Sequence, residues 1–166
     1  MTGLAGDITT EARIDFRSSK ILQEFVKRIN ATSAAVPKGT LPDGLTNLVL
    51  TRASQINGCA VCVDMHTKDA AHDGESAVRL NLLAAWRDAN VFTEAERAAL
   101  ELTEQATRIA DAAGGVTDEA WANAAKHYDT DQLAALVTTL AVINAYNRFN
   151  VMLKNQGGDY QVGQWG

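Results

Sequence analysis

The sequence predicts an all-α protein, a single compact domain of six to seven helices, and three observations support this fold class. Alanine, the residue with the highest helix propensity, occupies 28 of the 166 positions. The only prolines are Pro37 and Pro42, so none interrupts a helix after residue 42. No run alternates β-branched and polar side chains, as a half-buried strand would. A chain of this length ordinarily forms one domain.

Capping residues and breaks predict where the helices begin and end. A serine caps the first helix, and Pro42 with Asp43 favours the start of the second. The second helix stops at Asn57-Gly58, because both residues tolerate the left-handed conformation of a helix end. Thr93 and Glu96 have the spacing of a capping box. With the helical spacing of apolar residues, these signals predict helices over about 18–33, 43–56, 59–72, 75–87, 94–113, 117–128 and 130–154.

The two ends of the chain show no helical periodicity. Residues 1–17 are expected to form an irregular lead-in. Residues 155–166 are rich in glycine and polar side chains, and we expect a mobile tail or a segment that docks on a neighbouring subunit.

Charge and hydropathy exclude several classes of function. The net charge is −5, from 15 basic and 20 acidic residues, and no basic run occurs. Nucleic acids and anionic membranes are therefore not expected as partners. No stretch approaches the roughly 18 apolar residues that a bilayer span needs. The first residues lack the basic and apolar regions of a signal peptide, so we expect a cytoplasmic protein.

Two cysteines and a histidine form the most informative motif of the chain. Cys59 and Cys62 are three positions apart and His66 follows Cys62 by four, so on a helix the three side chains share one face. A nucleophilic thiol, a resolving thiol and an imidazole are the minimum set for thiol redox chemistry. The pair stands where a helix begins, so the backbone can adjust to a disulfide and the helix dipole favours a thiolate.

Two other interpretations of this motif stay open. Two cysteines at helical spacing can also be buried and inert core residues. A structural zinc site would use the two cysteines and His66 with a fourth ligand such as His72 or His127. A c-type haem needs a histidine directly after the second cysteine, where this chain has Val63, and a thioredoxin-like motif needs a βαβ context.

The segment Leu50–Ala70, which contains the motif, resembles the core motif of the AhpD-like alkylhydroperoxidase family, within the carboxymuconolactone decarboxylase superfamily. Ala141–Asn150 is similar to the Ile-Asn-Ala-Trp-Asn-Arg stretch common in small members, and the segments around Trp86 and Phe92 add support. The resemblance covers roughly residues 12–155. It implies an all-helical fold that assembles as a homotrimer or homohexamer.

For the chemistry, the resemblance implies a thiol-dependent peroxidase. In such proteins the second cysteine attacks the peroxide O–O bond and becomes a sulfenic acid, which the first cysteine resolves. Carried onto this chain, Cys62 is the attacking sulfur, Cys59 the resolving sulfur and His66 the proton relay. The implied partners are an organic hydroperoxide and a dithiol or thioredoxin-like reductant. No cofactor and no metal is implied.

Two positions depart from the family pattern. Members carry a glutamate twelve residues before the first cysteine, where this chain has Asn47, which can hydrogen-bond His66 but cannot take a proton. The better-characterised peroxidases carry a histidine just before the second cysteine, where this chain has Val61. Both changes remove proton-transfer capacity. The alternative function is therefore a dithiol–disulfide redox sensor or exchange protein with little peroxide turnover.

Further polar residues are candidates to support the site. Asp69 follows His66 by three positions and can orient its ring. Asn144, Asn147 and Asn150 recur every three residues on the last helix, where they line the thiol pocket, bond across a subunit interface or form a solvated stripe. We take Asn147, together with Asn47 and Asp69, as the supporting candidates.

Overall fold

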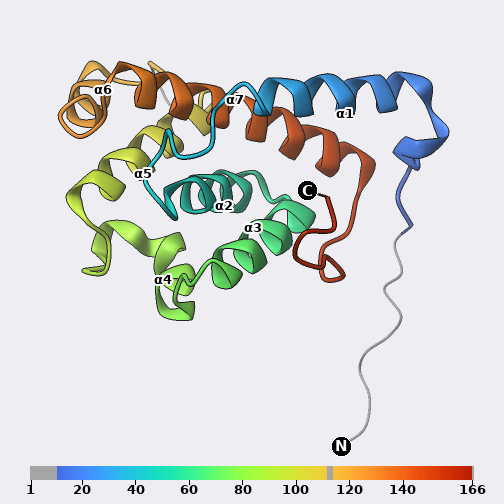
Figure 1. Cartoon of the computed structure of the whole chain (residues 1–166), viewed down its shortest axis with the longest axis horizontal. Coiled ribbons are helices and arrows are strands. Elements are labelled where there is room, and N and C mark those ends of the chain that lie inside the picture. The colour runs from blue at the N-terminus through green and yellow to red at the C-terminus, as the bar shows by residue number, and fades with distance from the viewer. Residues whose placement is uncertain (1–10, 112–113, 166) are drawn as a thin grey trace, which may run out of the picture.

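The computed structural model describes residues 11–111 and 114–165, and within these ranges all regular secondary structure is helical (Figure 1). The α-helices are α1 (Lys20–Ser33), α2 (Leu45–Asn57), α3 (Ala60–His72), α4 (Ala77–Leu82), α5 (Glu94–Thr107), α6 (Asp118–Ala124) and α7 (Thr130–Leu153). Two 3₁₀ helices are η1 (Phe16–Ser18) and η2 (Leu83–Asp88). The predicted all-α class is confirmed, and in the described part of the chain no helix is long and apolar enough to cross a membrane.

Three of the expected helices are shorter than predicted. The helix expected over 75–87 changes at Leu83 from α to 3₁₀ geometry and is kinked at Ala85, and Leu83 and Trp86 on either side of the kink are buried. The helix expected over 94–113 begins with the predicted Thr93–Glu96 capping box but ends at Thr107. The helix expected over 117–128 ends at Ala124, and a turn follows it.

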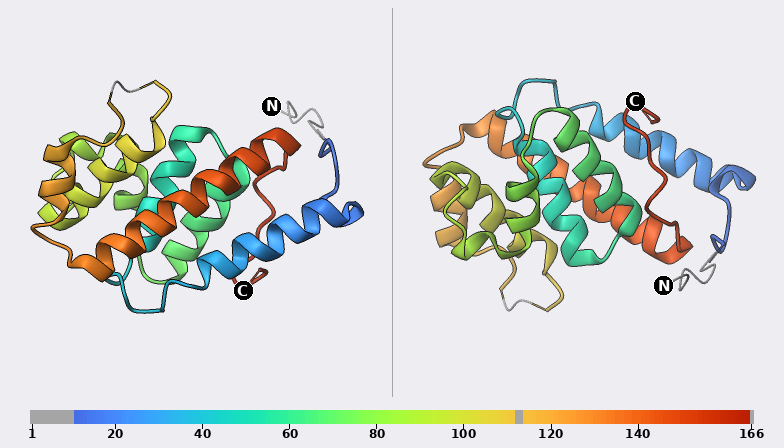
Figure 2. Two further views of the ribbon diagram at one scale, coloured as in Figure 1. Left: turned by 90° about the horizontal axis from the view of Figure 1, so that it is seen from above. Right: turned by 90° about the horizontal axis from the view of Figure 1, so that it is seen from below.

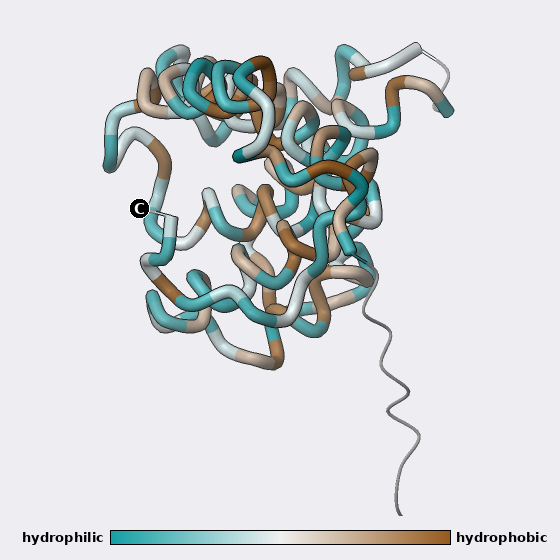
Figure 3. Tube along the Cα trace, turned by 90° about the vertical axis from the view of Figure 1, so that its right-hand side faces the viewer, coloured by the Kyte–Doolittle hydropathy of each residue, from teal (hydrophilic) through white to brown (hydrophobic). Residues whose placement is uncertain are grey.

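Helix α2 lies at the centre of the fold and packs against α3, α5 and α7 (Figures 1 and 2). Its side chains Leu45, Leu48 and Val49 are almost fully buried. Burying a side chain of this kind contributes about 1.5–3 kcal/mol. Hydrophobic and hydrophilic residues alternate along the helices in Figure 3, as this packing requires. The start of α3, which carries the two cysteines, is therefore fixed to the most buried helix of the protein.

Helix α1 lies along α7 at the edge of the fold (Figure 2). It is strongly amphipathic, yet none of its residues is buried, and Ile21 is 81% exposed. Its main aromatic contact is the stacking of Phe25 on Phe149, with ring centroids 5.0 Å apart. Of the expected lead-in, residues 1–10 lie outside the described residues, and Phe16–Ser18 form the turn η1.

The segment after α7, expected as a mobile tail or a segment that docks on a neighbouring subunit, returns along α3 of the same chain over residues 155–165 (Figures 1 and 2). The carboxylate of Asp64 accepts hydrogen bonds from the backbone N–H groups of Gly158 at 2.7 Å and Tyr160 at 3.1 Å. Lys68 donates to the carbonyl oxygens of the same two residues, each at 2.9 Å. Because backbone groups of the segment make these bonds, its own side-chain pattern did not predict them.

Candidate functional site

The two cysteines stand at the junction between α2 and α3. Gly58 ends α2 with a φ of 67°, a left-handed conformation that glycine adopts without strain. Cys59 is the N-cap of α3 in extended geometry, and Cys62 lies in the first turn. The Cα atoms are 5.4 Å apart and the sulfurs are at bonding distance, so the structure holds the pair as a disulfide. The expected place of the pair at the start of a central helix is confirmed.

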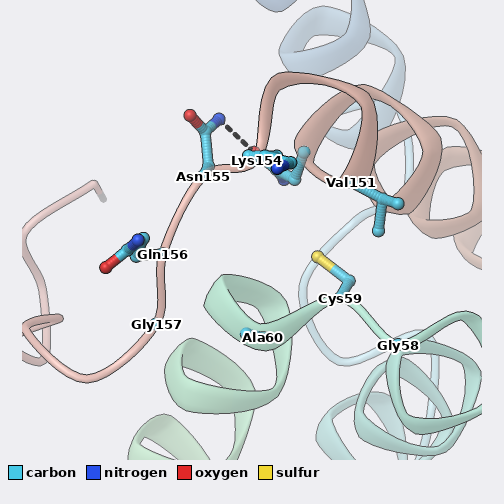
Figure 4. Close-up of a pocket in the computed structure, with 9 residues that line it drawn as sticks. Gly58, Cys59, Ala60, Val151, Lys154, Asn155, Gln156 and Gly157 are labelled. Carbon is cyan, nitrogen blue, oxygen red and sulfur yellow. Dashed lines mark hydrogen bonds between the residues drawn. The ribbon is translucent and has the colours of Figure 1, made fainter. Parts of the chain in front are cut away.

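Both cysteines are shielded from bulk solvent, and Cys59 lines a cavity. The exposed fractions are 1% for Cys59 and 2% for Cys62. A cavity of about 420 Å³ lies between the start of α3, the end of α7 and the C-terminal segment, and Cys59, Lys154 and Gln156 are among its lining residues. Figure 4 shows the Cys59 side chain pointing toward the end of α7. Cys62 is not among the residues that line this cavity.

His66 lies one turn after Cys62 on the buried side of α3. It is 8% exposed, and its Nε2 atom has no hydrogen-bond partner among the described residues. Burial disfavours the imidazolium ion and lowers the pKa of His66 to about 4. The ring is therefore neutral at pH 7, and burial makes it a weaker base than a solvated imidazole.

Two of the supporting candidates bond elsewhere. Asn47 donates through Nδ2 to the Oδ2 atom of Asp73, at 3.3 Å. Asp69 accepts a hydrogen bond from the hydroxyl of Tyr160, at 2.9 Å. The expected contacts of these two side chains with His66 are thus replaced by contacts with the end of α3 and with the C-terminal segment.

The third candidate, Asn147, ties α7 to α2. It is fully buried, donates to Ser54 Oγ at 3.1 Å and accepts from Asn57 Nδ2 at 2.9 Å. Asn57 also donates to Asn144 Oδ1, at 3.0 Å. Buried amides that satisfy one another in this way fix one geometry of the surrounding helices. Asn147 therefore holds the α2 end that leads into Cys59 and makes no bond to the cysteines.

The asparagine that contacts the disulfide is Asn150, one step further along the same stripe. Its Nδ2 atom lies 3.4 Å from Cys62 Sγ, and its Oδ1 atom accepts a hydrogen bond of 2.8 Å from Asn155 Nδ2. Figure 4 labels Asn155 and marks a hydrogen bond from its side chain by a dashed line. The three-residue spacing of Asn144, Asn147 and Asn150 was the available signal. The spacing alone could not tell which member faces the thiols, because that depends on how α7 crosses α3.

A second polar cluster lies away from the thiols. Arg52 donates to Glu104 Oε1 at 2.9 Å through Nε and 2.6 Å through Nη2. Trp86 donates to the same oxygen at 2.9 Å, and Arg87 donates to Oε2 at 2.9 Å. Burial alone would raise the pKa of Glu104, but the hydrogen bonds from Trp86 and Arg52 outweigh it, and the pKa is lowered. The cluster joins α2, η2 and α5 and has a structural role.

The zinc interpretation needs several ligands in one place. In the part of the chain that the structure describes, no group of three or more His, Cys, Asp or Glu side chains could hold a metal ion. His127, one of the two expected fourth ligands, is exposed and has its ring beside Tyr128. His72 is the last residue of α3, more than one and a half turns beyond His66.

Comparisons with known proteins agree with this fold. The sequence model of the carboxymuconolactone decarboxylase family matches residues 22–105. The uncharacterized protein YdfG of Bacillus subtilis strain 168 is 40% identical over 109 residues, which are 66% of this chain and 73% of YdfG. One similar crystal structure is that of an Agrobacterium tumefaciens protein of unknown function with a suggested role as the antioxidant defence protein AhpD. It matches with a TM-score of 0.82 and 34% identity, over 90% of this chain and 100% of that one. The debrominase Bmp8 shares the fold with a TM-score of 0.72 and 17% identity, over 87% of this chain and 75% of its own.

Proposed function

The chain belongs to the carboxymuconolactone decarboxylase family and has an AhpD-like fold, and from this we propose that it is a thiol-dependent peroxidase for organic hydroperoxides. One observation carries the proposal. The two cysteines are at bonding distance at the start of α3, and a neutral, buried His66 lies one turn further along the same helix. These are the groups that a peroxidatic cycle based on two thiols requires.

The proposed cycle gives a role to Cys62, Cys59 and His66. His66 accepts the Cys62 proton, and the thiolate attacks one peroxide oxygen. An S–O bond forms, the O–O bond breaks, and the proton goes to the departing alkoxide, so an alcohol leaves and Cys62 becomes a sulfenic acid. The Cys59 thiol then attacks the Cys62 sulfur, its proton goes to the departing hydroxide, water leaves, and the disulfide forms. A dithiol or thioredoxin-like protein, available in the reducing cytoplasm, returns both thiols.

The direct test is hydroperoxide consumption by the full chain, with tert-butyl hydroperoxide as oxidant and dithiothreitol as reductant. We expect turnover that needs the dithiol, and its loss in Cys62→Ser. In Cys59→Ser we expect a single turnover that leaves a sulfenic acid on Cys62, which dimedone traps.

Substituting His66 with asparagine should slow the reaction by about 10²-fold, as loss of a general base does. The control His72→Asn, at the exposed end of the same helix, should keep full activity. Unchanged turnover in Cys62→Ser would exclude the proposal.

A second candidate function is dithiol–disulfide exchange or redox sensing. Asn47 bonds to Asp73, so the position of the family glutamate supplies neither a proton carrier nor a contact to His66. A disulfide that is reduced and reoxidised readily, with negligible hydroperoxide turnover in the same samples, would favour this candidate over the peroxidase.

A further inference from the structure

The two sulfurs of the disulfide have different surroundings. Cys59 lines the cavity, whereas Cys62 is not among the lining residues and accepts the hydrogen bond from Asn150, which is one of them. We propose that an incoming thiolate attacks Cys59 through the cavity, and that Asn150 is the residue that stabilises Cys62 as the leaving thiolate. This inference rests on the proposed reduction by a dithiol, which the peroxidase and the exchange protein share.

The structure fixes the direction in which the Asn150 amide donates. Its Oδ1 atom accepts from Asn155 Nδ2 at 2.8 Å, and the Asn155 backbone N–H donates to the Asn150 carbonyl oxygen at 3.0 Å. Because the Asn155 side chain presents its NH₂ group to the Asn150 side-chain oxygen, the Asn150 NH₂ group faces Cys62. Asn155 is thus a positioning residue that acts through Asn150.

The turn between these two asparagines is held at an energetic cost. Lys154 ends α7 with a φ of 56°, the only positive φ of a residue other than glycine among the described residues. Such a conformation costs about 1–3 kcal/mol and persists only where surrounding contacts fix it. The turn directs the chain from Asn150 on α7 to Asn155 and on to the cavity wall.

The exchange step balances as an in-line displacement. The thiolate of the dithiol attacks Cys59 Sγ, a new S–S bond forms, and the Cys59–Cys62 bond breaks with its electron pair on Cys62 Sγ. The second thiol of the reductant, as thiolate, then attacks the reductant sulfur of the mixed disulfide. This releases Cys59 as a thiolate that takes up a proton, and the reductant leaves as its disulfide. The dithiol loses two electrons, and the protein disulfide gains them.

The new negative charge on Cys62 meets two stabilising groups. The Asn150 N–H donates to the sulfur, and a hydrogen bond to an ion is about twice as strong as one between neutral groups. Cys62 also lies in the first turn of α3, where the helix dipole favours an anion. A leaving thiolate that is stabilised departs faster. Asn150 therefore accelerates reduction without transferring a proton.

The side that the thiol attacks is tested without any peroxide. Oxidised full-length protein is treated with 2-mercaptoethanol in the presence of iodoacetamide, which traps the released thiolate, and the modified peptides are identified by mass spectrometry. We expect the mercaptoethanol adduct on Cys59 and the alkyl group on Cys62. The reverse distribution, or an equal mixture, would overturn the proposed direction of attack.

The role of Asn150 is tested with Asn150→Leu, which removes the donor at similar volume, and Asn150→Asp, which places a carboxylate beside the sulfur. We expect each variant to slow disulfide reduction by dithiothreitol at pH 7 by about tenfold or more, which corresponds to about 1.4 kcal/mol. In a Cys59→Ser background, we expect the pH midpoint of Cys62 alkylation to move upward. Asn155→Ala should give a smaller effect in the same direction, and Asn123→Leu on the exposed face of α6 should give none.

Circular dichroism and thermal unfolding show whether each variant is folded. Unchanged reduction and alkylation in folded Asn150→Leu would overturn the role of Asn150. If that variant does not fold, Asn150→Asp and Asn155→Ala decide the question by the same two readouts. Because these measurements need no hydroperoxide, they can contradict this proposal while the peroxidase proposal stands, and the reverse.

Discussion

Gly157 lies against the first turn of α3 so closely that a Cβ atom on it would stand 2.5 Å from the carbonyl oxygen of Ala60. The contact is with backbone, which cannot swing aside as a flexible side chain can. Glycine is needed at this position for close approach, and the approach places the C-terminal segment in the wall of the cavity beside Cys59.

Gly157→Ala should therefore detach the C-terminal segment from α3. Overpacking of this kind costs about 1–3 kcal/mol, and the displaced segment would relieve it. We expect faster hydrogen exchange in residues 157–165 and faster reduction of the disulfide by dithiothreitol, with little change in thermal unfolding. The control Asp159→Ala alters an exposed side chain of the same segment and should change neither rate. Exchange rates equal to those of the unaltered protein would show that the segment tolerates a Cβ atom there.

Stability should depend on pH through His66. The pKa is about 4 in the folded protein and about 6.5 when unfolded, so between these values the unfolded state binds the extra proton. The free energy of unfolding should fall by about 3 kcal/mol as the pH drops from 6.5 to 4, and should show no contribution from His66 above that range. In urea unfolding of the oxidised proteins, the fall in the free energy of unfolding should be smaller in His66→Asn than in the unaltered protein. It should be unchanged in His127→Asn. Parallel curves for all three proteins would contradict it.

Glu104→Gln should destabilise the fold away from the thiols. The substitution removes the charge that Arg52, Arg87 and the Trp86 N–H share. Because Arg52 is largely buried, we expect a loss of about 2–3 kcal/mol in urea unfolding. The control Glu24→Gln breaks only exposed pairs on α1 and should cost no more than about 0.5 kcal/mol. Equal losses in the two variants would refute a special role of the cluster.

Self-association is expected through α1. We propose that a second copy of the chain covers its half-buried apolar face, on which Ile21 is exposed, in a homotrimer or homohexamer. Sedimentation should then give three or six times the chain mass of 17.8 kDa. Ile21→Glu should lower that mass, and Val78→Glu, on an exposed position of α4, should not. A monomer at all concentrations would be evidence against this surface.

The parts of the fold that could be predicted are those with local signals. The Thr93–Glu96 capping box and the start of α3 at Cys59 depend on residues within one turn of each other, and both are confirmed. The end of α5 at Thr107 was not predicted, because the first helix-terminating residue that follows in the sequence is Gly114. The local sequence pattern therefore predicted the helices and their starts more accurately than their ends.

The surroundings of the thiols depend on contacts between distant segments, which a single sequence does not specify. Asn47 and Asp69 have the right spacing on their helices, but Asp73 and Tyr160 take up their hydrogen-bonding groups. Asn150 contacts Cys62 only because α7 crosses the start of α3 at that residue. The residues of the motif could be named in advance, whereas their polar partners could not.

The distance in sequence between Cys62 and Asn150 has a consequence for synthesis of the protein. The two residues are 88 positions apart in the sequence, and Asp64 and its hydrogen-bond partner Tyr160 are 96 positions apart. A ribosome adds 5–20 residues per second, so roughly 5–20 s separate the appearance of the thiols from that of the groups that cover them. During translation the nascent chain therefore presents Cys59 and Cys62 uncovered, and closure of the site is one of the last events in the maturation of the polypeptide.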